Sequence, residues 1–256
     1  MAEFWYGASP SGIQRNHKKY YPACRGKCEP ILHFLLRGIN VEDNPLHKKC
    51  RKSYELDIVY EDEYLIALNK PEGVLSVQGR EIDVSVLSKL SGKYGKVHAI
   101  HRLDMATSGI LIFAKDEETY KLMQAKFSDR EISKTYEAIL DESPSEKKGT
   151  IQLSLSASFL NRPMQMFDIN GKEAITDFEV VKENENGVHV IFKPKTGRTH
   201  QLRIHAAHHK GLNAPIKGDI LYGTPEKRLH LHASKLEFEH PITNEKTIIS
   251  CPSEFF

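Results

Sequence analysis

The sequence has little cysteine and no long apolar run. Its 256 residues include four cysteines, too few for the disulfide framework of a small secreted protein. The longest apolar runs, such as residues 109–114, are far shorter than the roughly 20 residues that a membrane-spanning helix needs. These absences exclude a disulfide scaffold and membrane insertion, and we expect a protein of the reducing cytoplasm.

A strong net charge is also missing. The formal charge of +2 does not by itself indicate a nucleic-acid partner, because the placement of charges matters more than their sum. Residues 1–56 hold ten Lys or Arg against five Asp or Glu, so this segment carries +5 and the other 200 residues carry −3. It also contains Trp5 and several tyrosines, whose rings can stack on unpaired bases, although a solvated surface is the alternative.

The pattern of the sequence changes near residue 57. Residues 1–56 show no sustained period of 2 or 3.6 and are interpreted as a basic appendage, whereas residues 57–256 form one large domain. Strands are expected at 57–60, 64–69, 109–115, 134–140, 150–155, 174–182, 188–193, 231–241 and 247–250. Helices are expected at 83–95 with Asp83 as N-cap, from Asp116 through residue 127, and at 199–210. Neighbouring strands predict an α+β fold: a large, mainly antiparallel mixed sheet with flanking helices and a central active-site cleft.

Two polar stretches are the candidates for chemistry. Residues 101–109 (HRLDMATSG) lie between apolar segments, and loops held by strands are where reactive side chains tend to be placed. Residues 195–205 (KTGRTHQLRIH) form a glycine turn before the last expected helix, whose first N–H groups would favour a bound anion. Asp104 and Arg198 taken singly have ordinary explanations, a turn residue and a surface ion-pair partner, so neither stretch alone assigns a function.

Both stretches resemble the signature loops of RluA-type pseudouridine synthases, which share the motifs HRLDxxTSG and TGRTHQ. Further segments resemble the family in the family's order. They are NKP with Gly73 (69–73), KTYEA (134–138), GDILYG (218–223), and LHA with HP (231–241). The resemblance therefore extends over roughly residues 57–256, which is stronger evidence than any single motif.

The resemblance implies an enzyme that isomerises uridine in structured RNA to pseudouridine, without a cofactor or a metal. Asp104 would be the catalytic carboxylate, Tyr136 would contact the target base, and Arg198 would pair with Asp104. Arg102 would help to hold the flipped-out nucleotide. Further RNA contacts are expected from His101, Thr107, Lys134, Thr199, His200 and Arg203.

The chemistry of the reaction fits these residue types. Moving uracil from a nitrogen to a carbon attachment breaks a glycosidic bond and develops positive charge at the anomeric carbon, which carboxylates stabilise in glycoside chemistry. A stacked uridine must also be flipped out before it can enter a closed site. Whether Asp104 attacks the sugar or removes a proton to form a glycal stays open at this point.

One departure from the family affects the choice of substrate. Many members begin with a small RNA-binding domain like that of a ribosomal protein, and residues 1–56 do not resemble it. The chain thus resembles the branch without that domain, whose members modify ribosomal or transfer RNA. We expect a monomer that acts on one of these RNAs.

Several alternatives remain open from sequence. Cys24, Cys28 and Cys50, with nearby histidines, could bind zinc, but their spacing is looser than a CxxC pair. His205 and His209, four residues apart, could also bind a metal, although no third ligand is evident. The rival functions are an RNA-binding protein without chemistry and a glycosidase, which would ordinarily need two carboxylates.

Overall fold

The computed structural model describes residues 53–79, 84–159 and 163–256. The predicted basic appendage lies outside these ranges except for its last four residues, and so does the alternative of zinc binding by Cys24, Cys28 and Cys50. The described ranges therefore belong almost entirely to the predicted catalytic domain.

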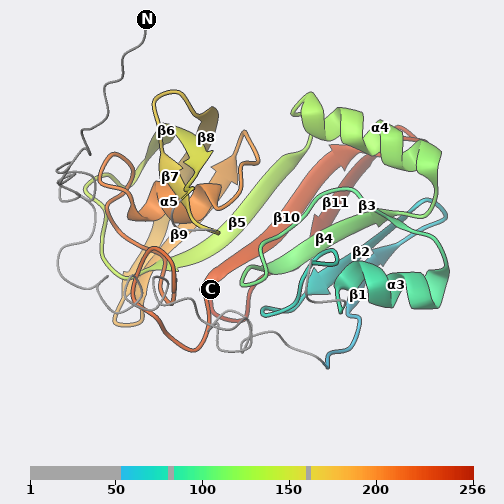
Figure 1. Cartoon of the computed structure of the whole chain (residues 1–256), viewed down its shortest axis with the longest axis horizontal. Helices are drawn as coiled ribbons and strands as arrows, with labels where there is room; N and C mark the ends of the chain where they lie inside the picture. The colour runs from blue at the N-terminus through green and yellow to red at the C-terminus, as the bar shows by residue number, and fades with distance from the viewer. Residues whose placement is uncertain (1–52, 80–83, 160–162) are drawn as a thin grey trace, which may run out of the picture.

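One sheet of eleven strands organises the described part of the chain (Figure 1). Its main path is β1 (Ile58–Glu61), β2 (Leu65–Lys70), β4 (Ser108–Ala114), β10 (Leu231–Glu239), β5 (Ser133–Leu140), β9 (Gly187–Pro194), β8 (Lys172–Asn184), β6 (Lys148–Ala157) and β7 (Gln165–Phe167). In addition, β11 (Lys246–Ser250) pairs with β10, and β3 (His98–Ala99) pairs with β4. The pairings between these strands are antiparallel except for β4 with β10. The predicted α+β class with a large, mainly antiparallel mixed sheet is confirmed.

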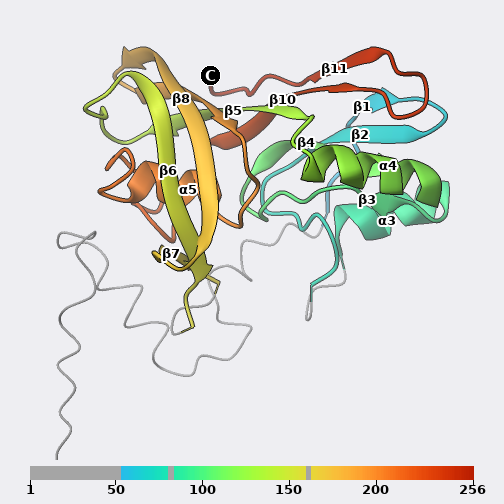
Figure 2. The same ribbon diagram turned by 90° about the horizontal axis from the view of Figure 1, so that it is seen from above.

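Three helices pack against this sheet in the described ranges, and Figure 2 shows α3 and α4 beside the β1–β4 half and α5 beside the other half. They are α3 (Val86–Tyr94), α4 (Glu117–Ser128) and α5 (Gln201–Ala207). Side chains of β4 alternate between the two faces of the sheet, so this strand packs against two helices. Leu111 and Phe113 share a buried cluster with α3, whereas Ile110 and Ile112 share one with Met123 of α4. None of the described helices is long and apolar enough to cross a membrane.

Three predicted helix boundaries are wrong. The N-cap of α3 is Ser85, not Asp83: its Oγ accepts a hydrogen bond from the Ser88 N–H at 3.1 Å, and the Ser88 Oγ accepts one from the Ser85 N–H at 2.9 Å. Helix α5 is seven residues long instead of spanning 199–210. It starts late because residue 200 has a positive φ of 53°, and it ends early because the chain turns back after Ala207.

The β4–β10 pairing joins the two halves of the molecule. It places Ala233 beside Gly109, at the point where the polar loop 101–107 enters β4. Gly109 has a φ of 109°, and a Cβ atom there would lie 2.3 Å from the Ala233 carbonyl oxygen. Only glycine allows both this conformation and this close approach, so Gly109 fixes where the polar loop meets β10.

We expect Gly109→Ala to destabilise the protein by about 2 kcal/mol or more, because it combines backbone strain with a clash against β10. The matched control is Gly92→Ala in α3, where a Cβ would meet nothing within 4 Å. That substitution should be neutral or stabilise by about 0.5–1 kcal/mol. Urea unfolding of both variants measures the difference, and equal stabilities would contradict the role given to Gly109.

Candidate active site

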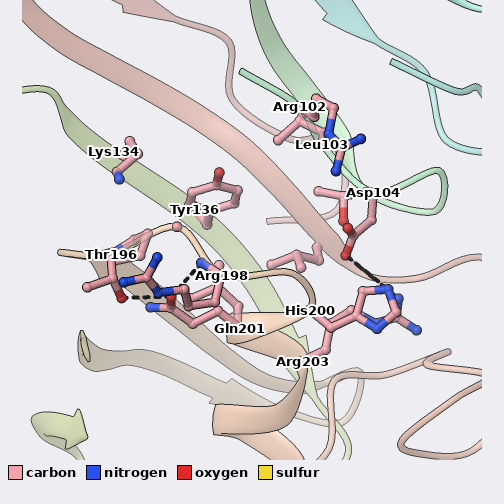
Figure 3. A pocket seen from close by; sticks show the side chains of 15 residues that line it. Arg102, Leu103, Asp104, Lys134, Tyr136, Thr196, Arg198, His200, Gln201 and Arg203 are labelled. Atoms are coloured by element: carbon pink, nitrogen blue, oxygen red, sulfur yellow. Dashed lines mark hydrogen bonds and ion pairs between the residues drawn. The ribbon is translucent and has the colours of Figure 1, made fainter. Parts of the chain in front are cut away.

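A cavity of about 110 Å³ lies where the two halves of the molecule meet (Figure 3). Its walls come from the loop before β4, from β5, and from the segment that leads into α5. The lining includes Arg102, Asp104, Thr107, Lys134, Tyr136, Thr196, Arg198, His200, Gln201 and Arg203. The structure thus gathers eight of the ten predicted site residues, and only His101 and Thr199 do not line the cavity.

The loop that carries Asp104 is anchored on both sides of that residue by the turn at 70–76. Leu103 donates its N–H to Ser76 Oγ at 3.0 Å and accepts a hydrogen bond from the same hydroxyl at 2.8 Å. The Met105 carbonyl accepts hydrogen bonds from the Gly73 N–H at 2.8 Å and from Lys70 Nζ at 3.1 Å. Asp104 therefore projects from a backbone that is fixed before and after it.

Lys70 is a buried support that sequence reasoning did not identify. Its side chain is fully buried, and Nζ also donates to the carbonyls of Pro71 and Val74, both at 2.9 Å. Burial lowers the pKa of Lys70 to about 7, although the carboxylates of Asp104 and Glu72 favour its charged form. The available signal was a lysine directly after an apolar strand, inside the NKP motif.

The Asp104 carboxylate faces two nitrogen groups from the opposite wall. Its side chain is 28% exposed, and Oδ2 lies 3.8 Å from His200 Nε2 and 3.8 Å from Arg203 Nη1. The ring of Tyr136 also lines the cavity, and burial, together with the charge of Asp104, raises the pKa of its hydroxyl. The phenol is thus held in its neutral form beside a carboxylate.

The predicted pairing of Arg198 with Asp104 is wrong. Arg198 is exposed, and its Nε donates to the Glu173 carbonyl at 3.0 Å, which draws the guanidinium along β8. Its backbone N–H donates to Gln201 Oε1 at 2.9 Å. Arg203, predicted only as an RNA contact, takes the position beside Asp104, where its side chain is buried.

Arg203 is held by a second carboxylate that sequence reasoning missed. Its Nε and Nη2 donate to the two oxygens of Asp219 at 2.7 and 2.6 Å, and both side chains are buried. Asp219 also accepts the N–H groups of Leu221 and Tyr222, at 2.9 and 3.1 Å. Burial disfavours the charge of Arg203, but Asp219 outweighs it and raises the pKa. The aspartate of the GDILYG segment was the available signal.

The remaining predicted residues differ in how much they face the cavity. His101 has internal partners: Nε2 accepts the Ile112 N–H at 3.3 Å, and the ring stacks on Phe127 at 5.1 Å. Burial lowers the pKa of His101 to about 3, with a smaller effect from Lys134. Thr199 and Arg102 are exposed, so both can be reached by a large ligand.

The structure offers little support for an anion site or a metal site built by α5. A helix of seven residues has a weak macrodipole, so the predicted binding of an anion at its start is not supported by helix length. His205 is buried whereas His209 is exposed. No group of three or more His, Cys, Asp or Glu side chains is placed to share a metal ion among the residues that the structure describes.

Comparisons with known proteins identify the family of the chain. A model of the RNA pseudouridylate synthase family matches residues 64–208. The dual-specificity RNA pseudouridine synthase RluA of Haemophilus influenzae is 39% identical over 209 residues, which cover 78% of this chain and 94% of the relative. The protein of the same name from Escherichia coli K12 is 38% identical, with the same coverage.

Two human structures have the same fold. RNA Pseudouridylate Synthase Domain Containing 1 superposes with a TM-score of 0.66 and 28% identity, covering 79% of this chain and 85% of that one. RNA Pseudouridylate Synthase Domain Containing 4 gives a TM-score of 0.64 over 78% of this chain and 90% of that one, and at 24% identity it supports the fold alone. Together, the family match and the RluA relatives show that the chain belongs to the RNA pseudouridylate synthase family, which isomerises uridine in RNA to pseudouridine.

Proposed function

We propose that the cavity receives one uridine flipped out of structured RNA and that Asp104 drives the rearrangement of its glycosidic bond. The observation that supports this most is that the Asp104 carboxylate lines the cavity and faces Arg203 and His200, each at 3.8 Å. The adjacent guanidinium limits the orientation of the carboxylate. An ionised oxygen is what both attack on the sugar and proton removal require.

The other residues of the cavity are given roles by their chemistry. Tyr136 contacts the uracil ring and keeps the detached base from turning freely or meeting water. Arg102, Lys134 and Arg198 supply positive charge around the opening, which suits the phosphates that flank an extruded nucleotide, while the buried Arg203 contributes its charge from inside the cavity. Thr107, Thr199 and His101 complete the proposed RNA contacts, His101 by supporting the loop that carries Arg102.

The two rival functions predict different cavities. A glycosidase ordinarily uses two carboxylates, whereas Asp104 is the only Asp or Glu among the described residues that line this cavity. A protein that only binds RNA has no need of a carboxylate placed inside a basic site, where it repels phosphate. We therefore favour isomerisation with retention of the base over hydrolysis or binding alone.

The substrate and setting are also proposals. The RluA relatives are named for dual specificity, which supports action on more than one RNA, and we propose ribosomal or transfer RNA. We further propose a monomeric cytoplasmic enzyme without a cofactor, in which the basic residues 1–56 add contacts to RNA outside the cavity. Mapping of pseudouridines by chemical labelling, in RNA from cells with and without the protein, identifies the modified sites.

Asp104→Asn should abolish formation of pseudouridine while leaving affinity for RNA within about tenfold, because the substitution removes a charge and keeps the shape. Product is measured by tritium release from uridine labelled at carbon 5, and affinity by filter binding. Isomerisation at a rate comparable to that of the unchanged enzyme would refute the role of Asp104.

A matched pair of substitutions tests which arginine serves Asp104. Arg203→Lys should lower kcat about 100-fold, because lysine cannot bind Asp219 through two nitrogens and also face Asp104. Arg198→Lys, which keeps the charge near the opening, should change kcat less than about threefold. Thermal unfolding of both variants serves as the control for folding. Equal losses of kcat in two folded variants would restore Arg198 as the partner of Asp104.

Removal of residues 1–52 should weaken RNA binding and reduce its dependence on salt. The slope of log K against log salt becomes shallower by about 0.7–0.9 for every phosphate that the shortened chain no longer neutralises. Binding of a structured RNA is measured over a series of salt concentrations for the full and shortened chains. Identical slopes would show that the basic segment does not contact the RNA backbone.

A further inference from the structure

Next to Asp104, the side chains of His200 and Tyr222 contact each other, and none of the roles proposed above uses this contact. Tyr222 Oη lies 2.8 Å from His200 Nδ1, and the two rings meet edge to face at 5.6 Å. The same hydroxyl accepts the N–H of Gln165 in β7 at 2.8 Å. Tyr222 is thus held by the backbone of β7, the last strand on the main path of the sheet, and in turn holds the ring of His200 at Nδ1.

The arrangement of donors and acceptors sets the tautomer of His200. The Gln165 N–H occupies a lone pair of the Tyr222 oxygen, so the hydroxyl hydrogen has to point to an acceptor. The nearer acceptor is His200 Nδ1 at 2.8 Å, since the Gln165 carbonyl lies at 3.4 Å. A neutral imidazole that accepts at Nδ1 carries its hydrogen on Nε2, and that nitrogen faces Asp104.

The charges around His200 agree with a neutral ring. Burial and the Arg203 guanidinium lower the pKa of His200, while the carboxylates of Asp104 and Asp219 oppose them less strongly. The side chain is buried, with 9% of the residue exposed. The direction of this pKa shift favours a neutral imidazole next to Asp104 over a second cation beside Arg203.

The backbone of His200 has an unusual conformation. Its φ of 53° lies in the left-handed region, which residues other than glycine rarely adopt. It occupies the N-cap position of α5, yet its side chain makes no capping hydrogen bond to the helix. The side chain is thus engaged with Tyr222 and Asp104 instead of stabilising the helix.

We propose that His200 is a positioning residue for Asp104 and that Tyr222 holds its ring in the tautomer protonated on Nε2. When RNA fills the cavity, the distance from His200 Nε2 to Asp104 Oδ2 shortens from 3.8 Å to that of a hydrogen bond. This inference rests on the proposed catalytic role of Asp104. Hydrogen bonds in unliganded active sites are often long and shorten only with substrate bound. Because Asp219 holds Arg203 and Tyr222 holds His200, the 218–223 segment orients both groups that face Asp104.

The tautomer can be observed directly. Nitrogen-15 NMR of protein labelled at histidine distinguishes the two neutral tautomers and the imidazolium, and His200→Asn identifies the resonances of His200. We expect the Nε2-protonated form at neutral pH, and a mixture of forms in Tyr222→Phe. A ring protonated on Nδ1, or an imidazolium, would overturn the inference whatever the activity of the enzyme.

Activity tests the function of the tautomer. The amide nitrogen of glutamine reaches the position of Nε2, whereas that of asparagine reaches only the position of Nδ1. Asparagine tolerates the left-handed backbone better than glutamine, so His200→Asn is the better-folded variant that lacks the donor. We expect His200→Asn to lower kcat about tenfold with little change in KM, and His200→Gln to recover most of the loss.

A double substitution shows whether Tyr222 acts through His200. Tyr222→Phe should lower kcat about tenfold in the unchanged enzyme and much less in the His200→Asn background. The inference is refuted if the losses of kcat from Tyr222→Phe and His200→Asn are additive, or if His200→Asn is as active as His200→Gln. In either case Asp104→Asn would still abolish activity, so the proposed function would stand. If instead Asp104→Asn keeps its activity, the proposed function fails and the NMR result stands separately.

Discussion

The parallel contact between β4 and β10 is the constraint on which the site depends. The loop that carries Asp104 ends at β4, whereas Arg203, His200 and Tyr136 belong to the half built on β5, β8 and β9. The two halves face each other at a fixed distance because β10 pairs with both β4 and β5. Gly109 makes that junction close enough, since any side chain at this point would collide with the backbone of β10.

Electrostatics within the site follow from the sharing of one guanidinium between two carboxylates. Asp219 holds Arg203 through two short hydrogen bonds, and Asp104 lies farther away at 3.8 Å. A buried arginine without a partner would be costly, so Asp219 allows Arg203 to remain charged inside the protein. Asp104 then keeps free oxygen lone pairs for the substrate while still lying beside a positive group.

Much of the fold and most of the cavity could be predicted from sequence, and the errors have physical causes. Alternating apolar residues and turns predicted the long strands, but β3 and β7 were missed because two or three residues show no period. The motif at 195–205 contains both Arg198 and Arg203, and the sequence alone does not determine which of the two faces Asp104. That choice depends on the left-handed residue 200, which shifts the start of α5, and on Asp219, which is distant in sequence.

The position of β10 in the chain has a consequence for synthesis of the enzyme. β10 comprises residues 231–239, so the strand that lies between β4 and β5 follows both of them in the chain and is synthesised after both. Without β10, nothing in the described sheet joins β4 to β5, so Asp104 and Arg203 are not held at a fixed distance from each other. A nascent chain that has not reached residue 231 therefore contains both the Asp104 loop and the Arg203 helix, but not the strand that joins their two halves.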